Sequence, residues 1–347
     1  MQHESKQATP VLQVKDLSVR FKTVNGLVTA VNQVSFDVAQ GETVALVGES
    51  GSGKSVTSLG LMRLTPPAPR AQLSGEVWFQ GTHDTQPVNL LSLSEKEMRH
   101  RRGTDIAMVF QEPMTSFNPL HTIGKQIAEG VRIHHGISKA AAFDRAAELL
   151  DMVGISAPRE RLKNYPHEMS GGMRQRAMIA MALANDPCLL IADEPTTALD
   201  VTIQAQITEL LQELQQKTKM ALLFITHNLG VVAEIADRVM VMYCGQIVEQ
   251  ATVEALFAQP GMPYTQGLLK SVPKLSLGEG HQSDLPAIPG SVPSPLALPS
   301  GCHFGPRCQH FDADVCQQAN PALAEVSAQH WVRCARWENV AGSLQHA

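Results

Sequence analysis

A glycine-rich segment, set between an apolar run and a helical pattern, constrains the fold of this chain more than any other feature of its sequence. Residues 43–47 are almost continuously apolar, which is typical of a β-strand buried on both faces. Residues 48–55 read GESGSGKS and match G-x-x-x-x-G-K-[ST], and a helical pattern extends from Ser55 to Met62. A strand, a glycine loop and a helix in this order predict a cradle for phosphate groups, because backbone N–H groups and the helix N-terminus face the anion.

The polar side chains of this loop suit a nucleotide with its metal ion. We expect Lys54 to reach the β- and γ-phosphates and the Ser55 hydroxyl to bind Mg²⁺. The other expected contacts come from the loop itself: Gly48, Ser50, Gly51, Ser52 and Gly53. A glycine-rich turn with a chance lysine is the alternative, and the flanking strand and helix disfavour it.

Apolar runs that resemble residues 43–47 alternate with helical patterns along the chain. The runs cover residues 106–110, 188–192 and 221–225. The helical patterns, with apolar positions on one face, include residues 143–153 and 203–214. This alternation predicts an α/β fold with a largely parallel sheet.

The rest of the chain suggests appended layers. Two β-like runs at 12–21 and 28–38, separated by Asn25-Gly26, predict an antiparallel β layer ahead of the α/β core. Residues 112–167 show several helical patterns and are expected to be a helical subdomain. Five prolines between Pro286 and Pro299 favour an extended linker. We therefore expect a nucleotide-binding domain over residues 1–258 and a C-terminal extension over 259–347.

Composition narrows the class of protein. Among 347 residues, 44% are hydrophobic and 18% charged, an ordinary globular balance. The net charge of −5 argues against a nucleic-acid partner. No apolar run approaches the ~20 residues of a membrane span, and residues 1–10 lack the apolar core of a signal peptide. These features predict a cytosolic chain that does not cross a bilayer by itself.

A second apolar strand ends in two carboxylates. Residues 189–192 lead directly to Asp193 and Glu194, at the strand end where α/β sheets bind ligands. Asp193 suits the carboxylate that holds hydrated Mg²⁺, and Glu194 suits a general base that orients and polarises the attacking water. The alternative is structural: residues 193–195 could open the next helix as its N-cap.

Three further features fit a nucleotide site. Gln111 and His227 each end an apolar strand, where they could contact Mg²⁺, the γ-phosphate or the water. Ser170, Gly171 and Gly172 precede a helical run and form a second anion-ready helix start. Because the chain has two such cradles but only one loop lysine, we expect a dimer in which one subunit completes the other's site.

The order of these motifs resembles that of the ATP-binding cassette (ABC) ATPases over about residues 10–258. Residues 48–55, Gln111, 170–175, 189–194, 198–200 and His227 match Walker A, the Q-loop, the signature, Walker B, the D-loop and the switch histidine. The resemblance implies a P-loop NTPase cassette: a RecA-like core, an antiparallel β layer and a helical subdomain. It also implies ATP hydrolysis with Mg²⁺ in a head-to-tail dimer.

The resemblance assigns further residues. Ser170, Gly171 and Gly172 would touch the partner's nucleotide, Asp200 would belong to the D-loop, and Phe21 looks like the aromatic residue that stacks on adenine. The signature departs from its common form, with Met169 and Met173 where Leu and Gln are usual. The alternative for Phe21 is core packing.

More particular stretches resemble the ATPase subunits of bacterial dipeptide and oligopeptide importers. They are residues 111–119, 165–173, 195–202 and 263–265. Residues near 98–100 and 108–116 are also similar to glutathione-importer ATPases, and nickel importers share the subfamily, so the cargo stays open. The resemblance implies a second ABC ATPase subunit (homologous or identical), two permease subunits and a periplasmic or extracellular substrate-binding protein. It places the chain peripherally, on the cytoplasmic face of the bacterial inner membrane.

Two other classes use the same cassette. A DNA-maintenance ATPase would need a long coiled coil, and the ~140 residues between Lys54 and Asp193 hold no sustained heptads. A soluble translation-associated protein would resemble two tandem cassettes, and this chain has one. An importer ATPase is therefore the leading hypothesis.

Four cysteines crowd into the C-terminal part of the chain. Cys302, Cys308, Cys316 and Cys334 suit a [4Fe–4S] cluster or tetrahedral Zn²⁺. The absence of C-x₂-C pairs favours iron–sulfur, as does the similarity to tails of peptide-importer ATPases. His303, His310 and His330 are alternative ligands, although surface positions are expected for them. Four unligated, buried thiols are the remaining alternative.

Overall fold

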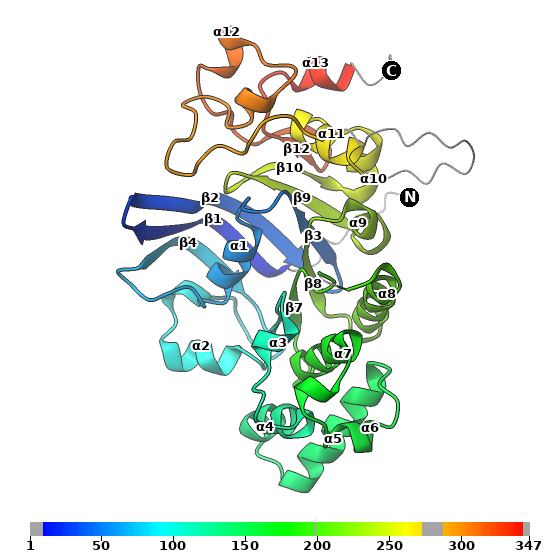
Figure 1. Cartoon of the computed structure of the whole chain (residues 1–347). Coiled ribbons are helices and arrows are strands. Elements are labelled where there is room, and N and C mark those ends of the chain that lie inside the picture. The colour runs from blue at the N-terminus through cyan, green and yellow to red at the C-terminus, as the bar shows by residue number, and fades with distance from the viewer. Residues whose placement is uncertain (1–9, 198, 273–286, 343–347) are drawn as a thin grey trace, which may run out of the picture. The chain divides into compact units, whose positions relative to one another are not determined.

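The computed structural model describes residues 10–197, 199–272 and 287–342 (Figure 1). Predictions for residues 1–9, for Ala198 and for Pro286 therefore lie outside the described residues. The described residues group into two compact units. The first contains residues 10–13, Asp37–Thr43 and Val77–Ile225, and the second contains Val14–Phe36, Val44–Glu76 and the chain from Thr226 onward. No helix of the described ranges is long and apolar enough to span a membrane.

The first unit contains three parallel strands in the order β8-β7-β6. They are β6 (Ile106–Val109), β7 (Leu189–Asp193) and β8 (Ala221–Thr226). Every residue of the three strands is buried, as expected for parallel strands covered on both faces. The runs expected at 106–110, 188–192 and 221–225 are thus strands, within one or two residues of their predicted bounds.

Helices fill the rest of the first unit. They are η1 (Leu90–Ser92), α2 (Glu95–Arg101), α3 (Pro113–Ser116), α4 (Ile123–His135), α5 (Lys139–Met152), α6 (Pro158–Arg161), η2 (Pro166–Glu168), α7 (Gly171–Ala182) and α8 (Val201–Thr218). Between residues 112 and 167 all the regular structure is helical, in agreement with the sequence patterns. The limits of a separate subdomain there stay a prediction.

Local signals explain where the longest of these helices begin and end. Thr122 and Ser138 cap the N-termini of α4 and α5, because each side chain accepts a hydrogen bond from a backbone N–H of the first turn. Gly136 ends α4 in the left-handed conformation, at φ 63°. The buried faces of α4 and α5 pack together, and both also contact α7.

Four strands form a separate sheet. This sheet has the strand order β2-β1-β4-β5, in which β4 and β5 pair antiparallel. It comprises β1 (Pro10–Thr23), β2 (Gly26–Ala39), β4 (Ala71–Phe79) and β5 (Val88–Asn89). β1 and β2 are joined by a turn at Val24 and Asn25, one residue before the predicted Asn25-Gly26. β4 and β5 were not predicted from the sequence. Apolar and polar residues hardly alternate in these two strands, and only three of the nine β4 residues are buried.

The second unit holds strands in the order β11-β12-β10-β9-β3. They are β3 (Thr43–Val47), β9 (Arg238–Tyr243), β10 (Gln246–Thr252), β11 (Ala324–Ser327) and β12 (His330–Val332). The helices are α1 (Lys54–Leu61), α9 (Leu229–Ile235), α10 (Val253–Ala258), α11 (Pro263–Lys270), η3 (Gly305–Arg307), α12 (Ala313–Cys316) and α13 (Trp337–Gly342). β3 runs parallel to β9, and β10 pairs antiparallel with both β9 and β12.

The C-terminal segment, residues 287–342, shares an apolar core with β3, the strand that leads into the glycine-rich loop. Phe304 and Val332 pack in one apolar cluster with Ala45 and Val47 of β3. β12 extends the sheet at β10, pairing Val332 with Glu249. In Figure 1 the segments β9, β10, β12 and α11 lie next to one another. The addition of β12 to the sheet attaches this segment.

Candidate active site

The loop between β3 and α1 contains glycines in conformations and surroundings that other residues do not tolerate. Gly48 and Gly53 have φ values of 154° and 108°. A Cβ at Gly48 would lie 2.3 Å from the Met242 carbonyl oxygen, and one at Gly53 would lie 2.5 Å from that of Ala30. Neither position can carry a side chain without moving the backbone. The glycines of the motif are therefore required by the close approach of neighbouring backbone.

Lys54 begins α1, with its side chain folded over this loop. Lys54 is 4% exposed. Its Nζ donates hydrogen bonds to the carbonyl oxygens of Gly48 (2.7 Å) and Glu49 (3.1 Å). The Ser52 hydroxyl is buried and has no hydrogen-bond partner within the described residues. Ser50 and Gly51 are exposed and Ser55 is half-buried, so the loop presents both polar side chains and backbone to a ligand.

Asp193 and Glu194 lie where the parallel strand β7 ends. Asp193 is 5% exposed and pairs with Ile225 of β8. Glu194 leaves the strand with φ 46°, and its N–H donates to the Ile225 carbonyl (2.9 Å). The helix N-cap interpretation of these residues is wrong, because α8 begins at Val201 and Asp200 caps it.

The Glu194 carboxylate has two side-chain donors in the first unit. Gln111 Nε2 donates to Glu194 Oε2 at 3.3 Å, and the Thr197 hydroxyl donates to the same oxygen at 2.8 Å. These two bonds fix the orientation of the carboxylate. The structure thus brings Gln111 and Glu194 together. The sequence analysis did not single out Thr197. The available signal was its position, a hydroxyl residue three places after Glu194.

The proposed signature residues form a capped helix start. Ser170 precedes α7, and its hydroxyl accepts from the Met173 N–H at 3.3 Å. Ser170 and Gly171 are exposed, while a Cβ at Gly172 would lie 2.9 Å from Ile203. This N-terminus can present backbone N–H groups to an anion. Asp200, the expected D-loop residue, accepts a hydrogen bond from the Ile203 N–H at 2.9 Å.

Phe21 and His227 lie in the second unit. Phe21 is in β1 and half-buried, so its ring is not fully used in core packing. His227 is exposed and directly follows β8, and Asn228 then caps α9 with bonds to the Gly230 and Val231 N–H groups. Both side chains are accessible to a ligand.

The four C-terminal cysteines line one small cavity. Cys302, Cys308, Cys316 and Cys334 share it with Met262, Phe304 and His310. Burial raises the pKa of the Cys302 and Cys308 thiols, and that of Cys334 to about 11. Within the described ranges, no group of three or more His, Cys, Asp or Glu side chains is arranged to hold a metal ion. The structure therefore brings the four thiols to one cavity but does not arrange three or more of them as ligands of one metal ion.

The histidines near these cysteines differ from expectation in one case. His330 was expected on the surface, yet it is 6% exposed. Its Nε2 lies 2.7 Å from Oε1 of the fully buried Glu249. The surface interpretation of His330 is wrong because β12 carries this side chain into the sheet–helix core. His303 and His310 are half-buried.

A glycine-rich loop with a buried lysine after one strand, and two carboxylates at the end of another, match the sequence pattern of P-loop nucleotide-binding proteins. The family model described as ABC transporter matches residues 31–197. A second model, the C-terminal region of oligopeptide/dipeptide transporters, matches residues 248–316.

Whole-chain relatives agree with both models. A putative peptide import ATP-binding protein of Brucella melitensis is 54% identical over 337 residues, covering 96% of this chain and 98% of the relative. The oligopeptide transport ATP-binding protein OppD of Bacillus subtilis is 52% identical over 327 residues, covering 94% and 89%. The dimeric ATP-binding cassette MJ0796, bound to ADP and Pi, matches with a TM-score of 0.61 and 27% identity, over 70% of this chain and 98% of that one. The chain belongs to the ABC transporter family, as one of its ATP-hydrolysing cassette proteins.

Proposed function

We propose that this chain is the motor subunit of an ABC importer for di- and oligopeptides. The observation that carries the proposal is the occurrence, on one chain, of the ABC cassette and the oligopeptide/dipeptide transporter C-terminal region. The names of the relatives in Brucella and Bacillus support the same cargo. ATP binding closes two cassettes and hydrolysis reopens them, and this difference in state reorients the membrane subunits.

We propose the following roles at the nucleotide. Lys54 and the loop N–H groups bind the β- and γ-phosphates, while Ser55, Gln111 and Asp193 hold Mg²⁺. Glu194 acts as general base on the attacking water, with His227 contacting the γ-phosphate. Gln111 and Thr197, which donate to Glu194, keep its carboxylate oriented. Phe21 stacks on the adenine.

A second cassette, identical or homologous, completes the site. Ser170, Gly171 and Gly172 at the start of α7 bind the nucleotide held by the partner's loop. Exposure of Ser170 and Gly171 and the dimeric state of the MJ0796 cassette support this assignment. Asp200 lies beside the same contact.

The membrane passage belongs to other polypeptides. We propose two permease subunits and a substrate-binding protein as partners, with the chain peripheral on the cytoplasmic face of the bacterial inner membrane. The helical stretch 112–167 receives the permeases. The cargo is tested by ATPase activity of the complex purified from native membranes. Stimulation by di- and oligopeptides is expected, and stimulation by nickel or glutathione instead would contradict the peptide assignment.

The base assignment is tested by Glu194→Gln. This change keeps the shape of the side chain but removes the proton acceptor, so ATP should still bind while hydrolysis falls by about 10²–10⁴-fold. The measurement is ATP affinity together with turnover in the assembled transporter. Glu209→Gln, the same change at an exposed position of α8, should leave turnover unchanged. Normal turnover of the Glu194 variant would reject the assignment.

We also propose that Cys302, Cys308, Cys316 and Cys334 bind a [4Fe–4S] cluster, or else Zn²⁺, as a structural cross-link of the Cys-rich C-terminal extension. Their shared cavity supports the proposal. Metal analysis after anaerobic purification should find about four iron per chain, or one zinc for the alternative. Cys316→Ser should lose the metal and Cys188→Ser, a matched change in the first unit, should keep it. Absence of both metals would reject the proposal.

A further inference from the structure

A C-terminal arginine pairs with a residue inside the phosphate loop. Nη1 and Nη2 of Arg307 lie 2.6 and 3.0 Å from Oε2 and Oε1 of Glu49, a two-pronged ion pair. The Arg307 side chain is 3% exposed and that of Glu49 is 30% exposed. Glu49 is the second residue of the loop 48–55. The pair thus connects two segments that are 258 residues apart in the sequence.

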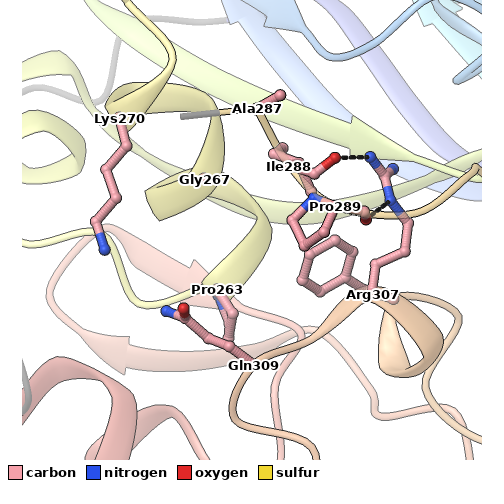
Figure 2. Close-up of a pocket in the computed structure, with 9 residues that line it drawn as sticks. Pro263, Gly267, Lys270, Ala287, Ile288, Pro289, Arg307 and Gln309 are labelled. Atoms are coloured by element: carbon pink, nitrogen blue, oxygen red, sulfur yellow. Dashed lines mark hydrogen bonds between the residues drawn. The ribbon is translucent and has the colours of Figure 1, made fainter. Parts of the chain in front are cut away.

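Arg307 is held in place by contacts other than Glu49. Its Nε donates to the Pro289 carbonyl at 3.0 Å and Nη2 donates to that of Ile288 at 3.3 Å, as Figure 2 shows. The guanidinium also lies 5.9 Å from the ring centroids of Tyr243 and Phe304. A planar guanidinium fixed in this way presents its donors to a carboxylate at little entropic cost. Arg307 is therefore pre-organised to receive Glu49.

The backbone of Glu49 is held from the same direction. Its N–H donates to the Tyr264 hydroxyl at 2.8 Å. Tyr264 is fully buried, with its ring centroid 4.6 Å from that of Tyr243 and 5.4 Å from that of Phe304. Burial raises the pKa of Tyr264, so its hydroxyl keeps its proton near neutral pH. Segment 292–298 additionally lines a cavity with Ser50 and Gly51 of the loop.

The negative charge of Glu49 opposes the binding of an anionic ligand to the loop. A carboxylate in a loop that cradles phosphates repels them, unless a cation neutralises it. Arg307 supplies that cation, and its bonds to Glu49 and Tyr264's bond to the N–H fix the loop residue between Gly48 and Ser50.

We propose that Arg307 is a positioning residue for the phosphate loop, through which the C-terminal segment sets the affinity for ATP. Arg307 acts on Glu49 and does not itself touch the nucleotide. The inference rests on the proposed nucleotide-binding role of residues 48–55. It implies that the C-terminal segment is a functional part of the ATP site.

The test is the ATP KM and kcat of the full chain, with Arg307→Met and Arg307→Lys. Arg307→Met leaves Glu49 unneutralised in the loop, and KM should rise about tenfold with kcat nearly unchanged. Arg307→Lys keeps the charge but not the two-pronged geometry, and should recover part of the loss. Arg333→Met is the matched control, since Arg333 bonds the Ile247 and Pro321 carbonyls instead of the loop. Its KM should change less than about twofold.

A double-mutant cycle separates charge neutralisation from general loosening. In the Glu49→Gln background the carboxylate is gone, so Arg307→Met should change KM by less than about twofold. An unchanged KM in Arg307→Met, or an equal rise with and without Glu49→Gln, would overturn the inference. Lys54→Ala distinguishes this failure from failure of the proposed site. If Lys54→Ala keeps wild-type ATP affinity, the cradle assignment itself is wrong.

Discussion

Two glutamates connect the C-terminal segment to the rest of the second unit, and they do so differently. Glu249 in β10 is fully buried, and its carboxylate accepts from the N–H groups of Gly261 (2.6 Å) and Met262 (3.1 Å) besides its contact with His330. Glu49 is partly exposed and pairs with one arginine. A fully dehydrated carboxylate is tolerated only when every lone pair is satisfied, whereas a partly hydrated one can serve a ligand-binding loop. The contacts of Glu249 stabilise the fold, whereas the Glu49–Arg307 pair adjusts the affinity of the loop for its ligand.

The largest expected effect is on stability and comes from removing the Glu249 carboxylate. Glu249→Ala leaves two backbone N–H groups and His330 without their acceptor, and should lower the free energy of unfolding by about 3–5 kcal/mol. Denaturant unfolding of the full chain measures this loss. Glu254→Ala, the same substitution at an exposed site of α10, should stay within about 0.5 kcal/mol. A loss below about 1 kcal/mol for Glu249→Ala would show that the two glutamates do not differ as described.

A smaller effect should appear at the loop. Tyr264→Phe keeps the ring packing but removes the acceptor of the Glu49 N–H, a hydrogen bond that contributes about 1 kcal/mol. ATP KM should rise about three- to tenfold, with little change in unfolding free energy. Tyr165→Phe, at an exposed tyrosine of the first unit, should leave KM unchanged. If Tyr264→Phe alters the free energy of unfolding but not KM, Tyr264 stabilises the fold, as Glu249 does, and does not act on the loop.

Much of the α/β core was predicted from local sequence patterns. The strands at 43–47 and 189–193 and the helix from Val201 were readable because continuous apolar runs and one-sided helical faces are local signals. β4 and β5 were missed because short, half-exposed strands carry little alternation. The N-cap interpretation of Glu194 failed because the next helix starts several residues later, at its own cap Asp200.

The sequence by itself predicted the glycine-rich loop with its lysine and the two carboxylates at the end of β7, because each is written in contiguous residues. The order of these motifs along the chain indicated the family. Only the tertiary structure decided that Thr197 shares Glu194 with Gln111, that β12 extends the sheet at β10, and that Arg307 pairs with Glu49. These are contacts between side chains or strands that chain folding brings together, and no spacing rule encodes a partner 258 residues away. The physical reason is that an ion pair depends on where two backbones come to lie, which packing of the whole core decides.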